Sequence, residues 1–162
     1  MDRFVSQFTN RLDAKGRVSI PASFRAVLAR DGFEGLFVHP SLDTPAVDCG
    51  GNALLREIDQ LLALHAPYSE ERGSFSMALF GASEILKIDA DGRVILSEKI
   101  KGFAGITSDV SFVGLGEKFQ IWEPGRLQAH FEEARNQVRD LRKQLNSLYA
   151  EPGGPRSQGA RE

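Results

Sequence analysis

A short segment of the sequence Asp-Ala-Lys-Gly-Arg, at residues 13–17, combines side chains that can hold an anion. Arg17 offers a planar fork of donors that matches a phosphate or the edge of a guanine, and Lys15 adds a point charge suited to phosphate. Gly16 can adopt a positive φ that other residues resist, and Asp13 can accept hydrogen bonds from the backbone just ahead of it. The segment therefore predicts a tight turn that presents two cations to an anionic partner.

The segment recurs as Asp-Ala-Asp-Gly-Arg 76 positions later in the chain (89 − 13 = 76). Residues 12–18 and 88–94 are identical at five of seven positions. The second copy predicts another turn, built on Asp89 and Gly92. One such segment would be an ordinary structural turn, whereas recurrence at a fixed offset with matching flanks indicates a duplicated module.

The two copies differ at the tip of the turn, where Asp91 occupies the position of Lys15. A carboxylate at this position repels phosphate. We therefore expect the second turn to bind an anion more weakly than the first. Arg93 is then expected to have a structural role or to bind Asp89.

Each copy is expected to lie between a strand before it and a strand and a short helix after it. The flanking strands are predicted at residues 7–9, 18–20, 85–88 and 94–96. Helix-start signals follow in both copies, at Pro21 and at Ser97. The modules thus have the order strand, tight turn, strand, helix.

The remaining elements are predicted from periodicity and from breaking residues. They are a helix over residues 21–30 that ends at Gly32, a strand over 36–38, a loop over 40–52, a helix from an N-cap at Asn52 to about His65, a helix from Ser69 to Phe80, a hairpin of strands 110–113 and 119–122, and a long helix that begins at Pro124. The two central helices separate the modules.

The long helix carries apolar residues at alternating spacings of four and three. They are Leu127, Phe131, Ala134, Val138, Leu141, Leu145 and Leu148. This heptad pattern predicts a seam that packs against another helix or a groove, or a helix that docks on its own domain. The residues from 151 to 162 lack apolar side chains and are expected to be disordered.

Charge is distributed unevenly along the 162 residues, whose formal net charge is −2. Residues 1–30 carry six basic and two acidic side chains (6 − 2 = +4), and the rest of the chain carries 14 − 20 = −6. This asymmetry favours an anionic partner for the N-terminal module, with Arg3 among the expected contacts, although an ordinary charged surface would also produce it. No segment approaches the roughly 20 apolar residues of a membrane span, so we expect a cytoplasmic protein without a membrane partner.

Catalytic and metal-binding patterns are not found in the sequence. His39, His65 and His130 are scattered, and Cys49 is the only cysteine. The sequence contains no phosphate-binding loop, nucleophile elbow or zinc-protease motif. We therefore predict no catalytic residue, no metal site, no cofactor and no enzyme activity.

These features together resemble the MraZ family of bacterial transcriptional regulators. The residues that carry the resemblance are 12–21, 89–94, 80–84 and 119–122, and the similarity extends over roughly residues 1–150. It implies an α+β fold of two tandem AbrB-like swapped-hairpin β modules that form a pseudo-symmetric barrel, with flanking helices and a long C-terminal helix. The expected divisions are a first module at 1–51, a helical connector at 52–81, a second module at 82–125, the C-terminal helix at 126–150 and the tail at 151–162.

The resemblance also implies a function and partners. Members bind double-stranded DNA at short promoter repeats, regulate their own operon in the division and cell-wall gene cluster, and assemble as ring-like homo-oligomers of the octamer or dodecamer class. Arg17 and Lys15 match the family's DNA-contacting positions. A repressor that associates with the nucleoid is therefore expected.

Two points leave alternatives open. The family has a firm apolar strand late in the first module, whereas residues 46–51 here are short and glycine-rich, so the pairing of that strand is not expected from the sequence. The same barrel also serves antitoxin-like proteins that bind another protein. An antitoxin usually has one module and a long disordered tail, whereas this chain has two modules and a short tail.

Overall fold

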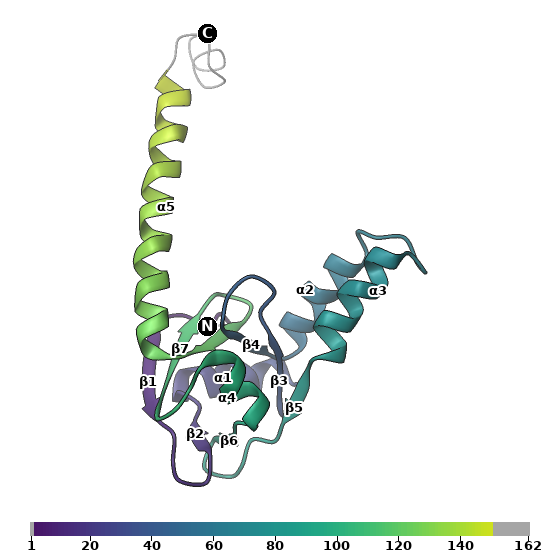
Figure 1. Cartoon of the computed structure of the whole chain (residues 1–162), viewed down its shortest axis with the longest axis vertical. Coiled ribbons are helices and arrows are strands. Elements are labelled where there is room, and N and C mark those ends of the chain that lie inside the picture. Colours follow the sequence, from purple (N-terminus) through teal and green to yellow (C-terminus); the bar gives the residue numbers. More distant parts are fainter. Residues whose placement is uncertain (1, 151–162) are drawn as a thin grey trace. The chain divides into compact units, whose positions relative to one another are not determined.

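The computed structural model describes residues 2–150, which form helices and antiparallel strands (Figure 1). The elements are β1 Gln7–Arg11, β2 Arg17–Ser19, α1 Ala22–Asp31, β3 Leu36–Pro40, β4 Val47–Gly50, α2 Asn52–Leu62, α3 Glu70–Ser76, the π-helical turn η1 Met77–Gly81, β5 Glu84–Leu86, β6 Arg93–Ile95, α4 Glu98–Ala104, β7 Asp109–Gly114, β8 Phe119–Trp122 and α5 Pro124–Ala150. The mixture confirms the α+β class. The chain divides into two compact units, residues 1–124 and 125–162, and the predicted tail lies outside the described residues.

The main sheet interleaves strands from the two halves of the sequence. Its order is β1-β7-β8-β4-β3-β5, and all of its pairings are antiparallel. The order is symmetric: β1 pairs with β7 of the second half, and β5 pairs with β3 of the first half. Each half therefore needs strands of the other half to complete its hydrogen bonding. The described strands form two sheets rather than one closed barrel.

A second, two-stranded sheet joins the two copies of the repeated segment. β2 and β6 pair antiparallel with Val18 opposite Val94, and both valines are 1% exposed. The two strands that flank the first turn, β1 and β2, therefore do not pair with each other. Instead β1 pairs with β7 and β2 pairs with β6. The repeat in the sequence becomes a local two-fold relation in the structure.

The core beneath these sheets is aromatic at its centre. Phe24 of α1 lies 4.8 Å from Phe119 and 5.4 Å from Phe4, between ring centroids. The same core cluster contains one valine of each strand of the small sheet and one residue just after each strand, namely Val18, Val94, Ile20 and Leu96. Such packing stabilises the β2–β6 pair from one side and leaves its other side available to solvent.

The predicted loop over 40–52 is wrong in part, because β4 lies within it. All four residues of β4 are buried, and the strand pairs with both β3 and β8. The sequence did not favour this strand because the stretch is short and glycine-rich, and it also contains the charged Asp48. Its carboxylate accepts hydrogen bonds from Lys118 Nζ at 2.8 Å and Gln120 Nε2 at 2.7 Å, so the buried charge is matched. Burial also raises the pKa of the Cys49 thiol.

The predicted N-cap of α2 at Asn52 is also wrong. The helix begins after Gly51, and the carboxylate of Asp31 accepts hydrogen bonds from the backbone N–H of Asn52 at 2.6 Å and of Ala53 at 3.0 Å. A side chain from the end of α1 thus satisfies the first donors of α2. The predicted start of α3 is confirmed, since Ser69 Oγ accepts a hydrogen bond from Arg72 N at 3.2 Å.

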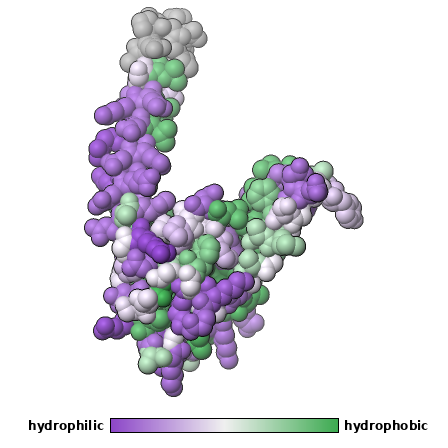
Figure 2. Space-filling view, in the orientation of Figure 1, coloured by the Kyte–Doolittle hydropathy of each residue, from purple (hydrophilic) through white to green (hydrophobic). Residues whose placement is uncertain are grey.

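Helix α5 confirms the predicted long C-terminal helix. Side chains of its heptad seam remain substantially exposed, including Phe131, Val138, Leu141, Leu145 and Leu148. Figure 2 shows apolar residues along one edge of this helix, among polar ones. Both interpretations of the seam, packing against another helix or a groove and docking on its own domain, therefore stay open.

Candidate nucleic-acid interface

Asp13 organises the first turn through both of its carboxylate oxygens. Oδ1 accepts hydrogen bonds from the backbone N–H of Lys15 at 2.9 Å and of Arg17 at 2.8 Å, and Oδ2 accepts one from Arg17 Nε at 2.7 Å. Gly16 has a φ of 79°, as the turn requires. The backbone N–H of Arg17, followed by its side chain, lowers the pKa of Asp13 against the opposing effect of desolvation. The turn is thus rigid, with Lys15 exposed near its tip.

The second turn repeats this geometry. Asp89 Oδ1 accepts hydrogen bonds from Asp91 N and Arg93 N, both at 2.9 Å, and Oδ2 accepts one from Arg93 Nε at 3.1 Å. Gly92 has the same φ of 79°. The backbone N–H of Arg93 is the largest cause that lowers the pKa of Asp89. The predicted contact between Arg93 and Asp89 is confirmed, and the equivalent contact in the first turn was not foreseen.

The turns differ in what holds the arginine. Arg93 Nη2 donates to Asp91 Oδ2 at 3.1 Å, so two carboxylates hold its guanidinium. In the first turn Lys15 replaces that second carboxylate. Within the described residues, Arg17 has only the Asp13 carboxylate as a side-chain partner, and its two terminal nitrogens face no acceptor. Both arginine side chains are partly exposed, at 28% for Arg17 and 29% for Arg93.

Hydrogen bonds across the small sheet join the two turns into one surface. Leu96 N donates to the carbonyl of Gly16 at 2.9 Å, and Ile20 N donates to the carbonyl of Gly92 at 3.0 Å. Side chains alternate along a strand, so burial of the central valines places the residues beside them on the outer face. These residues are Arg17, Ser19, Arg93 and Ile95. Figure 1 shows the loops before β2 and β6 at the same end of the unit.

Arg3 is not brought together with the first turn. It lies before β1, and Phe4 next to it forms a bridge with Gly116, whereas the turn follows the other end of the strand. Arg3 Nη1 forms an ion pair with Glu117 Oε1 at 3.3 Å. The structure thus separates one predicted DNA contact from Lys15 and Arg17.

Arg25 is a residue of the site that sequence reasoning missed. Its Nη1 donates to the carbonyl of Ile20 at 2.7 Å, and a β-carbon built on Gly92 would lie 2.5 Å from Arg25 Cδ. The Arg25 side chain, which comes from α1, therefore covers the second turn and supports it.

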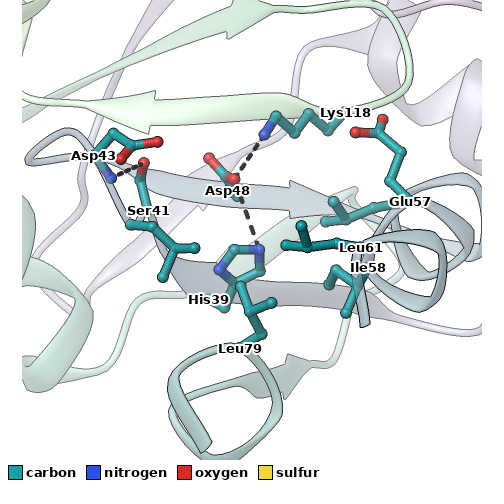
Figure 3. A pocket seen from close by; sticks show the side chains of 11 residues that line it. His39, Ser41, Asp43, Asp48, Glu57, Ile58, Leu61, Leu79 and Lys118 are labelled. Carbon is teal, nitrogen blue, oxygen red and sulfur yellow. Dashed lines mark hydrogen bonds and ion pairs between the residues drawn. The ribbon is translucent and has the colours of Figure 1, made fainter. Parts of the chain in front are cut away.

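A separate cavity of about 320 Å³ lies between β3, β4 and α2 (Figure 3). His39 and Asp48 point toward it and are 3% and 4% exposed. His39 Nε2 lies 3.6 Å from Asp48 Oδ2, which also holds Lys118. This network joins β3, β4 and the residue just before β8. Within residues 2–150 no group of three His, Cys, Asp or Glu side chains is arranged to hold a metal ion.

The helices of the described residues do not resemble membrane spans. None in residues 2–150 combines sufficient length with sufficient apolar character to cross a bilayer.

Comparisons with known proteins identify similar chains. A family model described as "MraZ protein, putative antitoxin-like" matches residues 79–146. A protein of Beijerinckia indica named "Transcriptional regulator MraZ" is 71% identical over the whole of both chains, and one of Methylocella silvestris with the same name is 68% identical over the same extent. A more distant relative with this name, from Parvibaculum lavamentivorans, is 43% identical over 96% of this chain and all of its own.

Proposed function

The chain belongs to the MraZ family of transcriptional regulators, and on this premise we propose that its first turn binds promoter DNA in a sequence-specific manner. The observation that carries the proposal is the pair of cations at a rigid tip, Lys15 beside the Arg17 fork. Because the carboxylate of Asp13 uses only Nε of Arg17, the terminal nitrogens can reach a phosphate or a guanine edge. Little backbone entropy is lost on binding, since the turn is already ordered.

The family resemblance extends the proposal to the target. We propose that the chain represses its own operon in the division and cell-wall gene cluster by binding short repeated boxes in the promoter. It acts in the cytoplasm, associated with the nucleoid, and needs no cofactor or catalytic residue. Lys15 contacts phosphates and Arg17 reads the sequence, whereas Arg3 contributes a separate and weaker phosphate contact.

The AbrB-like arrangement is part of the same proposal. The first and second modules, residues 1–51 and 82–125, correspond to swapped hairpins related by pseudo-symmetry, and their strands lie in two sheets rather than in one closed barrel. Support comes from the exchange of strands between the halves and from the pairing of β2 with β6. In this arrangement both turns point the same way, so that one chain presents a single composite surface.

Self-assembly completes the proposal, as a ring of the octamer or dodecamer class. The exposed apolar seam of α5 supports it, because such a surface favours contact with another protein surface. A ring allows several turns to engage several boxes, and each further contact gains from effective concentration. Light scattering should then report a mass several times 17.8 kDa, whereas a monomer would remove the avidity argument.

The test of DNA binding is a titration against the DNA upstream of the chain's own operon. Wild type, Lys15→Ala and Arg17→Ala are compared on this DNA and on a scrambled duplex at several salt concentrations. Loss of one phosphate contact should reduce the slope of log K against log salt by about 0.9 for each engaged turn. If neither variant changes the affinity or the slope, the turn does not contact DNA and the proposal fails.

The second candidate is an antitoxin-like module that neutralises another protein, which the description of the matching family model mentions. For this function, replacement of Arg17 should leave the affinity for the neutralised protein unchanged. The upstream-DNA titration distinguishes the two functions, because only the regulator requires the cationic tip.

A further inference from the structure

Lys101 lies beside the first turn although it belongs to the second half of the sequence. A β-carbon built on Gly16 would lie 3.9 Å from Lys101 Nζ. The hydrogen bond from Leu96 N to the Gly16 carbonyl brings the start of α4 to this position. The turn therefore has a third cation close to it, in addition to Lys15 and Arg17.

Helix α4 holds this lysine in place. Ser97 Oγ accepts a hydrogen bond from Ile100 N at 3.2 Å and donates one to Glu84 Oε2 at 3.0 Å. Ile100 and Ala104 anchor the helix in the core, at 5% and 0% exposed. The Lys101 side chain is only 21% exposed, so its stem packs on the protein and its ammonium has a restricted position.

The repeat relates Lys101 to Arg25, since 25 + 76 = 101. Each cation lies on the turn of the opposite half: Arg25 beside Gly92, and Lys101 beside Gly16. Their partners differ. Arg25 Nη1 donates to the backbone carbonyl of Ile20, a contact that supports the fold.

Lys101 instead forms an ion pair with Glu98 Oε1 at 3.0 Å, and the Glu98 side chain is 92% exposed. An ion pair with one partner so exposed contributes little stability. A phosphate oxygen can replace this carboxylate at small cost, because the ammonium is already directed to the turn. The exchange converts an intramolecular pair into a charge-assisted contact with the ligand.

We infer that Lys101 is a third phosphate-binding residue of the first turn, and that Glu98 competes with the phosphate for it. The inference rests on the proposed binding of DNA by Lys15 and Arg17. The anion site is then composite: the first half of the chain supplies the turn, and the second half supplies the cation beside it. In this inference the second half of the chain contributes a cation to the site, although its own turn has an acidic tip.

The experiment compares wild type with Lys101→Gln, Glu98→Gln and the double variant on the upstream DNA, at several salt concentrations. Lys101→Gln should weaken binding several-fold and reduce the salt slope by about 0.9 for each engaged chain. Glu98→Gln should strengthen binding, and this gain should disappear in the Lys101→Gln background. Loss of the gain separates competition for Lys101 from a general effect of removing one negative charge.

Lys99→Gln is the matched control, since it removes the same charge from the same helix. Lys99 lines a different hollow, with Glu84 and Phe103, and should leave the affinity nearly unchanged apart from general screening. Thermal unfolding of each variant verifies that the fold is retained.

Arg17→Ala is titrated in parallel to separate this inference from the proposed function. If Arg17→Ala loses binding while Lys101→Gln keeps the wild-type affinity and slope, Lys101 is not a ligand and only the inference fails. The inference is equally overturned if Lys99→Gln and Lys101→Gln weaken binding alike. If neither Arg17→Ala nor Lys15→Ala changes the affinity or the salt slope, the proposed function fails and the inference with it.

Discussion

The two turns of this chain have the same backbone but different surroundings. Each is closed by an aspartate that accepts two backbone hydrogen bonds and one from an arginine, around a glycine with a φ of 79°. The difference is one residue at the tip, Lys15 in the first turn and Asp91 in the second. Duplication thus preserved the geometry of the turn, whereas the charge at the tip determines what each copy can bind.

The charge difference acts through the arginine as well as through the tip. Arg93 donates to two carboxylates, and a phosphate would have to displace one of them. Arg17 donates to one carboxylate and keeps the outer part of its fork for a ligand. In the first turn the terminal nitrogens of Arg17 are therefore available to an external anion. In the second turn the Asp91 carboxylate already binds a terminal nitrogen of Arg93.

The largest expected effect is on DNA affinity. Arg17→Ala should lose the preference for the promoter box over scrambled DNA, because a bidentate contact to guanine contributes about 1–3 kcal/mol of discrimination. Arg93→Ala should cost much less, since its guanidinium is held by Asp89 and Asp91. The measurement is the ratio of the two dissociation constants at a fixed salt concentration. Equal losses for the two variants would show that both turns contact DNA and that Asp91 does not weaken the second turn.

The next effect is on stability. Here a substitution in the second turn should have the larger effect, whereas for DNA affinity the first turn matters more. An alanine at either glycine must adopt a left-handed φ, which costs about 1–2 kcal/mol. Gly92→Ala also places its β-carbon 2.5 Å from Arg25 Cδ, whereas the nearest atom to a β-carbon at Gly16 is 3.7 Å away. We expect Gly92→Ala to lower the free energy of unfolding more than Gly16→Ala. Urea unfolding monitored by the fluorescence of the buried Trp122 measures both, and a larger loss at Gly16 would contradict the role given to Arg25.

Local signals in the sequence were sufficient for the two turns and for some of the helix ends. The glycine of each turn adopts the predicted positive φ, Ser97 caps α4, and Gly32 ends α1 with a left-handed conformation. These features depend on neighbours within a few residues. The charge difference between Lys15 and Asp91 could also be read from the sequence. The hydrogen bond from Arg17 to Asp13 and the one from Arg93 to Asp91 were not predicted.

Features that depend on distant residues could not be predicted. β4 was missed because Asp48 is neutralised by Lys118 and Gln120, some seventy positions later. The cap of α2 comes from Asp31, which lies 21 residues before the N–H it binds. The correspondence of Lys101 with Arg25 could be read from the repeat offset. The proximity of Lys101 to Gly16 could not, because it follows only from the pairing of β2 with β6.

A smaller effect should follow from Asp91→Asn, which makes the second turn more like the first. The change removes a charge that repels phosphate and weakens one of the two contacts of Arg93. Binding to the upstream DNA should strengthen, by less than about 1 kcal/mol because the group is exposed. The gain should grow as salt is lowered. Unchanged affinity at all salt concentrations would indicate that the second turn does not face the DNA at all.

Arg3→Ala tests whether the interface extends beyond the turn. Because Arg3 lies at the other end of β1 and pairs with Glu117, its replacement should reduce the salt slope less than Lys15→Ala does. The two variants differ by one positive charge each from wild type, so they form a matched pair. A larger reduction for Arg3→Ala would move the centre of the interface away from the first turn.

The smallest effect concerns pH, and here the two turns should behave alike. The pKa values of Asp13 and Asp89 lie below the ordinary aspartate value, because backbone N–H groups and an arginine stabilise each carboxylate. A carboxyl whose pKa is lower in the folded state than in the unfolded state stabilises the fold above its unfolded pKa, and this contribution is lost as pH falls through the folded pKa. Stability should therefore be insensitive to these groups near neutrality and should decline below about pH 4. Asp13→Asn and Asp89→Asn each keep an acceptor oxygen but cannot titrate, so each should flatten the acid limb by a similar amount in urea unfolding at several pH values. If a variant loses stability with falling pH as steeply as the wild type does, the turn that carries the substitution does not contribute to the acid sensitivity.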